Sequence, residues 1–150
     1  MEINDSIATI LQHKGHAAVQ AVAPDTLVYE AIRLMADRNI GCVLVMDGAR
    51  LLGILSERDY TRKVVLQGRS SKITTVQEIM TREVICVTPQ HGVEQALRLI
   101  TENRVRHLPV IERGRVTGLI SIGDLVKWVI HAQRSALSQL EAYVAGGYPG

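Results

Sequence analysis

The sequence is poor in aromatic residues, with no phenylalanine, one tryptophan and four tyrosines among 150 residues. Proteins that bind single-stranded nucleic acid commonly stack the bases on aromatic side chains, and these few rings cannot form such a platform. An excess of charge of one sign is also missing, because 17 lysines and arginines nearly balance 15 aspartates and glutamates and leave a formal net charge of +2. The net charge therefore indicates neither a nucleic-acid nor a membrane partner.

Cysteines and long apolar runs are scarce as well. The two cysteines, Cys42 and Cys86, lie in apolar stretches and form no Cys-x-x-Cys motif, so we interpret them as buried free thiols in a reducing compartment. No apolar run reaches the roughly 18 residues that a membrane-spanning helix requires. Residues 1–5 lack the basic and apolar regions of a signal peptide. We therefore expect a cytoplasmic protein.

The motifs of common metal and catalytic sites are missing too. His13, His16 and His107 have no carboxylate or thiol at a spacing that would complete a metal shell. His107 could act as an acid or a base, but neither an activated nucleophile nor a paired carboxylate accompanies it. No glycine-rich phosphate-binding loop is found. We expect no metal site and no enzymatic activity.

What the sequence does contain is an internal repeat. Segment 53–59, Gly-Ile-Leu-Ser-Glu-Arg-Asp, returns at 118–124 as Gly-Leu-Ile-Ser-Ile-Gly-Asp, an offset of 65 residues (118 − 53). At this offset, residues 22–60 and 87–125 align without a gap and share eleven identities in 39 positions. Chance would give about two or three, so one supersecondary unit is used twice. We divide the chain into 1–73, a first repeat with an N-terminal helix, and 74–150, a second repeat with a long C-terminal helix.

Hydrophobic periodicity predicts the same order in both repeats: strand, helix, strand, strand, helix. Units of about 60 residues are marginal alone, so the two should share one core. For the first repeat we expect a leading helix from residue 3 to near Lys14-Gly15, then a strand at 17–22 and a helix at 26–39. Strands at 43–46 and 51–55 should follow, joined by a turn at Asp47-Gly48, and then a helix from Ser56 to about Gln67. For the second we expect a capped helix at 75–80, then a strand at 84–87, a helix at 92–103, strands at 107–111 and 116–120 turning at Arg113-Gly114, and a long helix from Ser121 to Gly146-Gly147.

Each repeated motif places a serine where a strand ends and a helix begins, with an aspartate three residues later. Ser56 with Asp59, and Ser121 with Asp124, have the form of a helix-capping box. The same geometry suits a ligand, because a helix amino terminus attracts anions. The hydroxyl could donate to a phosphate and the carboxylate could accept both hydrogen bonds of a ribose diol, while Gly53 or Gly118 allows close backbone approach. The residues alone leave both interpretations open.

The two copies of Gly-aliphatic-x-Ser-x-x-Asp, together with Arg106-His107-Leu108-Pro109-Val110 before the second copy, resemble the cystathionine-β-synthase (CBS) domain. A tandem pair resembles a Bateman module, and the resemblance covers about residues 14–130. It implies an α/β (α+β) fold of two β-α-β-β-α units packed with pseudo-twofold symmetry, with flanking helices and two clefts between the units. It also implies that the clefts bind an adenosine compound such as AMP, ADP, ATP, NAD or S-adenosylmethionine, held as a ligand rather than as a catalytic cofactor.

Carried over to this sequence, the resemblance implies that the aspartate holds the ribose and the serine approaches the phosphate. One cleft would combine Ser56 and Asp59 with segments 15–18 and 40–43. The other would combine Ser121 and Asp124 with segments 81–85 and 105–109. The basic residues of the two clefts differ, so we expect unlike affinity or ligand preference. The candidate binding residues are Lys14, Gly15, His16, Ala18, Ile40, Gly41, Cys42, Ser56, Arg58, Asp59, Arg62, Thr81, Ile85, Arg106, His107, Leu108, Pro109, Ser121 and Asp124.

The last predicted helix carries an apolar seam at alternating spacings of four and three: Val126, Ile130, Gln133, Leu137, Leu140 and Val144. The seam could pack on the chain's own first helix through Ile3, Ile7 and Ile10, or on a second copy in a homodimer, and we expect both. The function that we predict is a nucleotide-sensing regulatory module that passes ligand occupancy to an effector protein. The alternatives are a dimeric scaffold without a ligand and an enzyme.

Overall fold

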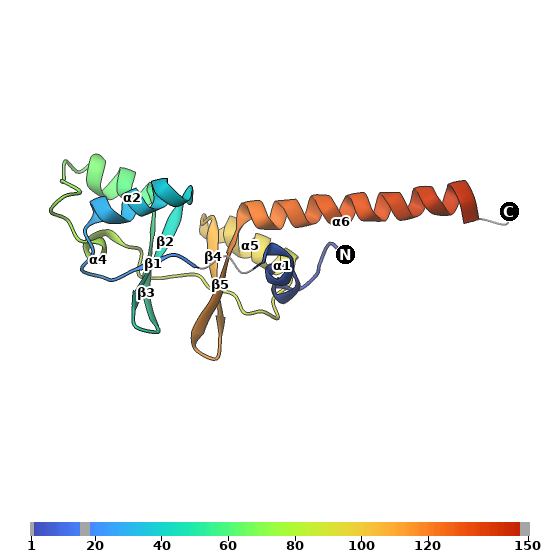
Figure 1. The fold of residues 1–150 in the computed structure, drawn as a ribbon, viewed down its shortest axis with the longest axis horizontal. Coiled ribbons are helices and arrows are strands. Elements are labelled where there is room, and N and C mark those ends of the chain that lie inside the picture. The colour runs from blue at the N-terminus through green and yellow to red at the C-terminus, as the bar shows by residue number, and fades with distance from the viewer. Residues whose placement is uncertain (1, 16–18, 148–150) are drawn as a thin grey trace.

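The computed structural model describes residues 2–15 and 19–147, which form two halves that each combine a small sheet with helices (Figure 1). The first part of the chain forms α1 (Ile7–Lys14), β1 (Ala21–Val22), α2 (Val28–Arg38), β2 (Cys42–Asp47), β3 (Arg50–Ser56), α3 (Glu57–Tyr60) and the π-helical stretch η1 (Thr61–Val65). The remainder forms α4 (Val76–Ile79), α5 (Val93–Asn103), β4 (His107–Glu112), β5 (Arg115–Ser121), α6 (Ile122–Ala142) and a second π-helical stretch, η2 (Tyr143–Gly147). The predicted mixed fold of two repeated units is confirmed.

The sheets repeat the pairing as well as the sequence. β1 is parallel to β2, and β2 is antiparallel to β3; β4 and β5 form an antiparallel pair in the other half. Cys42 faces Ser56 in one hairpin, and His107 faces Ser121 in the other, again 65 residues away. The register shifts after Val45 and after its counterpart Val110. Each serine therefore ends its strand at the same place in its hairpin.

The predicted strand at 84–87 is wrong, and Pro109 gives the reason. In the first half, Leu44 donates its backbone N–H to the Gln20 carbonyl at 3.0 Å and so extends the pairing beside β1. Pro109 occupies the equivalent position (44 + 65) and has no N–H to donate. A single parallel bridge remains, between Val87 and Val110.

Boundaries near the amino terminus also differ from the prediction. α1 begins at Ile7 rather than near residue 3, because Ser6 caps it by accepting a hydrogen bond from the Thr9 N–H at 3.3 Å. Ile3 lies before the helix and is 49% exposed. Of the strand predicted at 17–22, only Ala21–Val22 forms β1; residues 19 and 20 lie outside any strand, and residues 16–18 lie outside the described part.

Two further predictions in the first repeat need correction. The hairpin turns at residues 48–49 and not at Asp47-Gly48, because Asp47 still pairs with Arg50 across the strands. The helix after Ser56 is α-helical only to Tyr60 and then widens into η1.

The helix that precedes each repeat packs on the other repeat. α1 contributes Ile7 and Ile10 to the core of the second half, whereas α4 contributes Val76 and Ile79 to the core of the first. The anchoring bonds correspond, since the Ile7 N–H donates to the His91 carbonyl and the Val76 N–H to the Thr26 carbonyl, both at 2.8 Å. α1 thus precedes the first half in the sequence but completes the core of the second, and α4 precedes the second half but completes the core of the first.

Gly53 and Gly118 receive these crossing segments. A Cβ added at Gly53 would lie 2.7 Å from both the Met80 Sδ and the Thr81 carbonyl oxygen. A Cβ at Gly118 would lie 2.9 Å from the Leu11 side chain. The segments that approach these glycines closely are therefore the chain's own, those that contain Leu11 and Met80–Thr81. The sequence-based interpretation expected a ligand there.

α6 is packed only along its first turns. Leu125, Trp128 and Ala132 are buried, whereas none of the residues at 133–146 is buried, and the helix projects beyond the rest of the fold (Figure 1). The apolar residues of the predicted seam are exposed: Val126 by 45%, Ile130 by 42%, Leu137 by 56%, Leu140 by 58% and Val144 by 72%. The prediction that the seam packs on the first helix is wrong, because α1 covers the opposite face of α6. Within the described residues, no helix has both the length and the apolar character needed to cross a membrane.

Candidate functional site

A cavity of about 770 Å³ lies between the two halves. The end of α1, the connection from α2 to β2, and β5 form its walls. It brings together seven of the predicted residues: Lys14, Gly15, Ile40, Gly41, Cys42, His107 and Ser121. The sequence-based set missed other lining residues, namely Leu11, Gln12, Val19, Gln20, Asn39, Val116, Thr117, Gly118 and Leu119. Of the described lining residues, two are basic, Lys14 and His107, and none is acidic.

The α2–β2 wall of the cavity is set by the end of α2. Asn39 caps this helix in a left-handed conformation with φ of 53°, which turns the chain toward β2. Gly41 then passes close to the other half, since a Cβ added there would lie 3.5 Å from the His107 Cε1. Arg104, at the equivalent position of the second repeat (39 + 65), caps α5 in the same way, with φ of 54°. The repeat alignment pairs these two positions and could have shown that both end a helix.

Ser121 and Asp124 form a capping box at the start of α6, as the sequence predicts. The Asp124 N–H donates to the Ser121 Oγ at 3.0 Å, and the Ser121 N–H donates to the Asp124 Oδ2 at 2.9 Å. The Lys14 ammonium lies 2.9 Å from the same Oδ2 and also donates to the Leu119 carbonyl at 2.9 Å. Within residues 2–15 and 19–147, the other oxygen, Oδ1, accepts no hydrogen bond. It is therefore available to a ligand.

The charge of Asp124 is secured by its neighbours. Burial raises the pKa of this carboxyl, but the hydrogen bonds from Lys14 and Ser121 outweigh burial, and the net shift is downward. The side chains of Lys14 and Asp124 are 33% and 22% exposed. The carboxyl of Asp124 is therefore ionised at neutral pH, and both side chains are still reachable by solvent.

Ser56 and Asp59 form the same capping box at the start of α3 but do not open into the cavity. The Asp59 Oδ2 accepts hydrogen bonds from the Ser56 N–H and hydroxyl, both at 3.0 Å. Its Oδ1 accepts a hydrogen bond from the Thr81 hydroxyl at 3.1 Å and lies 3.0 Å from the Lys63 ammonium. The residue is only 7% exposed. Both carboxylate oxygens are thus occupied by the chain itself.

The predicted assignment of segments to the two clefts is wrong. Gly15 and residues 40–42 were expected beside Asp59, but they share the cavity with Ser121. Thr81 was expected beside Asp124 and instead contacts Asp59. The physical reason is that α1 and α4 each pack on the other repeat. The chain after α1 therefore reaches the Ser121/Asp124 motif, and the chain after α4 reaches the Ser56/Asp59 motif.

The remaining predicted residues lie outside the cavity. Arg58 donates to the Arg104 carbonyl at 3.0 Å, and Arg62 and Arg106 are exposed elsewhere. Ile85 and Leu108 belong to the core of the second half, and Pro109 is buried within β4. His16 and Ala18 lie outside the described residues.

The thiol of Cys42 in the cavity lining is not activated for nucleophilic attack. Burial raises the pKa of the Cys42 thiol to about 12, despite the opposing influence of Lys14, so this thiol is protonated. Burial and then the charge of Lys14 lower the pKa of His107. Across the residues that the structure describes, no three His, Cys, Asp or Glu side chains gather so as to hold a metal ion.

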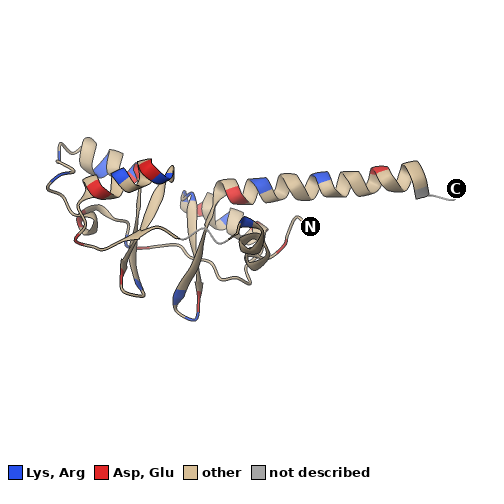
Figure 2. Ribbon diagram, viewed as in Figure 1, with Lys and Arg blue, Asp and Glu red and all other residues tan. Residues whose placement is uncertain are grey.

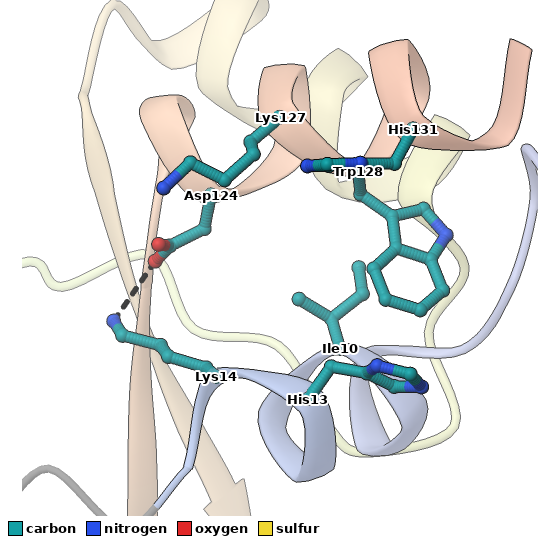
Figure 3. Close-up of a pocket in the computed structure, with 7 residues that line it drawn as sticks. All are labelled: Ile10, His13, Lys14, Asp124, Lys127, Trp128 and His131. Atoms are coloured by element: carbon teal, nitrogen blue, oxygen red, sulfur yellow. Dashed lines mark hydrogen bonds and ion pairs between the residues drawn. The ribbon is translucent and has the colours of Figure 1, made fainter. Parts of the chain in front are cut away.

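A second, smaller pocket of about 380 Å³ lies between α1 and α6 (Figure 3). Its lining consists of Ile10, His13, Lys14, Asp124, Lys127, Trp128 and His131. Lys14 lines both this pocket and the larger cavity. The ion pair between Lys14 and Asp124, seen at one side of Figure 3, therefore lies at the boundary between the two spaces.

The sequence profile of the CBS domain matches residues 16–66 and again residues 76–131. The chain belongs to the CBS domain family. A CBS domain-containing protein of Arabidopsis thaliana, named CBSX3, mitochondrial, is 42% identical over 95% of this chain and 73% of its own length. A solved CBS domain structure shares 50% identity and a TM-score of 0.81 over 85% of this chain and 98% of its own. A putative signal-transduction protein with CBS domains from Burkholderia ambifaria shares 49% identity and a TM-score of 0.81 over 86% and 96% of the two chains.

The fold is also that of the CBS domain pair of protein MJ0100, which was solved in complex with 5-methylthioadenosine and S-adenosyl-L-methionine. That pair has a TM-score of 0.73 with this chain at 22% identity, over 87% of this chain and 98% of its own. The likeness at this level of identity concerns the fold.

Proposed function

We propose that this CBS pair is a regulatory module that binds an adenosine-containing ligand in the cavity beside Ser121 and reports its occupancy to an effector protein. One observation carries the proposal: of the two Ser/Asp motifs, only the second meets the cavity among the described residues, with Ser121 in its lining and Asp124 at its boundary, bonded to the lining residue Lys14 and with one carboxylate oxygen unbonded. Ligand pockets commonly measure about 300–1,000 Å³, and a cavity of about 770 Å³ lies within that range.

The ribose and the phosphate of such a ligand could each form hydrogen bonds with a side chain at this site. A ribose diol would donate to the Asp124 carboxylate, and a phosphate would accept from the Ser121 hydroxyl at the amino terminus of α6. The Lys14 ammonium, now held by Asp124, would turn to the phosphate, and His107 is the second basic group in the lining. The adenine would lie among small and apolar residues such as Gly41 and Leu119.

Related structures and the lining both support this ligand class. A CBS pair of the same fold was solved with two adenosine compounds, 5-methylthioadenosine and S-adenosyl-L-methionine. The two basic side chains of the cavity favour members that carry phosphates, such as AMP, ADP, ATP or NAD, over S-adenosylmethionine. The proposal includes a homodimer. It includes no catalytic step, and the protonated thiol of Cys42 is not an activated nucleophile.

A thermal-shift panel of AMP, ADP, ATP, NAD and S-adenosylmethionine tests the proposal. A bound ligand at 100 times its dissociation constant should stabilise the fold by about 2.7 kcal/mol, which corresponds to several degrees in melting temperature. Calorimetry should then show one tight site per chain, because Asp59 is closed by the chain itself. A panel in which no member raises the melting temperature would overturn the proposal.

The variant Asp124→Ala tests the role of the second motif. It removes charge-assisted hydrogen bonds worth about 1.5–3 kcal/mol, so affinity should fall roughly tenfold to a hundredfold. Asp47→Ala is the matched control, because it removes an exposed carboxylate at the end of β2, outside the lining. If Asp124→Ala melts earlier but binds with unchanged affinity, the motif is a helix cap and nothing more.

A further inference from the structure

The outer part of α6 is a helix without cover. None of the residues at 133–146 is buried, and this segment extends past every other element (Figure 1). Isolated helices shorter than roughly 12–15 residues are marginal in water. The exposed seam follows one side of α6 from Val126 to Leu140, over about 21 Å at 1.5 Å per residue, and continues to Val144 in η2. Apolar surface of this extent indicates a partner.

The spacing of the seam indicates what kind of partner. Its members recur at intervals of four, three, four, three and four residues, an average close to the 3.5-residue period of two helices in a coiled coil. A helix that packs on a globular surface usually shows a broader stripe of 3.6-residue period. The seam is therefore shaped for another helix with the same period.

We infer that α6, with the adjoining η2, pairs antiparallel with the same segment of a second copy of this chain, through the seam formed by Val126, Ile130, Gln133, Leu137, Leu140 and Val144. In such a pair Val126 faces Val144, Ile130 faces Leu140, and Gln133 faces Leu137. All three pairs are centred on Ser135, so a single register satisfies them. This inference rests on the homodimer of the proposed function and names its surface.

The charges of α6 favour the antiparallel direction. The helix carries only four Lys, Arg, Asp or Glu residues, namely Asp124, Lys127, Arg134 and Glu141, so most of its ribbon is tan in Figure 2. Lys127 and Glu141 flank the same edge of the seam fourteen residues apart (141 − 127), nearly symmetric about its centre. An antiparallel pair therefore places Lys127 near Glu141 of the second copy twice.

A parallel pair would lack these contacts. In a parallel pair, the edge that carries Lys127 and Glu141 would lie against the opposite edge of the seam on the second copy. That opposite edge consists of Val129, Ala136 and Tyr143, which carry no charge. The one like-charge contact in the antiparallel pair is Arg134 with its own copy near the centre. Charge complementarity thus selects a second copy in the antiparallel direction.

Sedimentation velocity of the full chain without ligand, over a range of concentrations, tests the inference. The wild-type chain should dimerise, Leu137→Asp should raise the dimer dissociation constant at least tenfold, and Ser138→Asp, on the exposed outer side of the helix, should leave it unchanged. Both variants should keep the wild-type circular dichroism spectrum, because neither side chain is buried. A wild-type monomer at every concentration, or a Leu137→Asp chain that dimerises normally, would overturn the inference.

A charge exchange tests the direction. Glu141→Lys should weaken the dimer several-fold by placing like charges opposite each other, and the double variant Lys127→Glu with Glu141→Lys should restore it. Arg134→Gln should tighten it. Failure of the double variant to recover would rule out the antiparallel pairing. Ligand binding by Leu137→Asp separates the two proposals, because loss of the dimer with ligand binding intact concerns only this surface.

Discussion

The two Ser/Asp motifs have the same spacing and the same capping geometry, yet they differ in what covers the carboxylate. Asp59 is closed by Lys63, four residues later in the same helical segment, and by Thr81 from the crossing segment. Position 63 corresponds to Trp128 in the second repeat (63 + 65), which carries no positive charge and donates its Nε1–H to the Glu2 carbonyl instead. Asp124 is held instead by Lys14, through one oxygen. Residues outside a repeated motif therefore decide which copy remains open to a ligand.

The largest difference that we expect between the two copies is in stability. Asp59→Ala removes a nearly buried carboxylate and leaves Lys63, Thr81 and the Ser56 N–H without their acceptor, which should cost about 3 kcal/mol and on the order of 10 °C in melting temperature. Asp124→Ala should cost about 1 kcal/mol, the usual value of a helix cap. Thermal denaturation of both variants measures the difference. An equal or larger loss for Asp124→Ala would contradict this account of the two copies.

A smaller contrast is expected between the equivalent glycines. In Gly53→Ala the new Cβ meets the backbone carbonyl of Thr81, which cannot move without disturbing its hydrogen bonds to Ile54. In Gly118→Ala it meets only the flexible side chain of Leu11. We expect Gly53→Ala to destabilise the fold by about 1–3 kcal/mol and Gly118→Ala by less, as measured by chemical denaturation. The reverse order would show that the crossing segment at Gly53 yields more easily than the one at Gly118.

The smallest expected effect concerns pH and the equivalent positions Cys42 and His107. Because the folded protein lowers the pKa of His107, the unfolded chain binds more protons as the pH falls below the ordinary histidine value of about 6.5. The stability associated with neutral His107 is therefore complete above that pH and decreases as the pH falls toward the folded pKa. Cys42, with a pKa of about 12, does not titrate in this range.

His107→Gln should flatten the dependence of stability on pH between about 7 and 5. Denaturant melts at several pH values measure this slope, with Cys42→Ser as the control that should leave the slope unchanged. A slope that persists in His107→Gln would assign the dependence to other groups.

Most of the fold could be predicted from the sequence because its signals are local. The repeat offset, the turn at Arg113-Gly114 and the capping serines depend on neighbouring residues, and the structure confirms them. The prediction of a strand at 84–87 was wrong because the apolar pattern of a segment does not show which strand it would pair with. Only pairing with β4 brings in Pro109, which lacks the N–H that a longer strand requires.

The sequence by itself determined that one unit occurs twice and that each copy offers a serine and an aspartate at a helix start. Only the tertiary structure decided which copy is open, because α1 and α4 each cross to the other half and bring Lys14 to Asp124 and Thr81 to Asp59. Such contacts join residues up to 110 positions apart and leave no periodic trace in the chain. The exposed side of α6 was likewise settled by packing, since periodicity defines an apolar face but not what covers it.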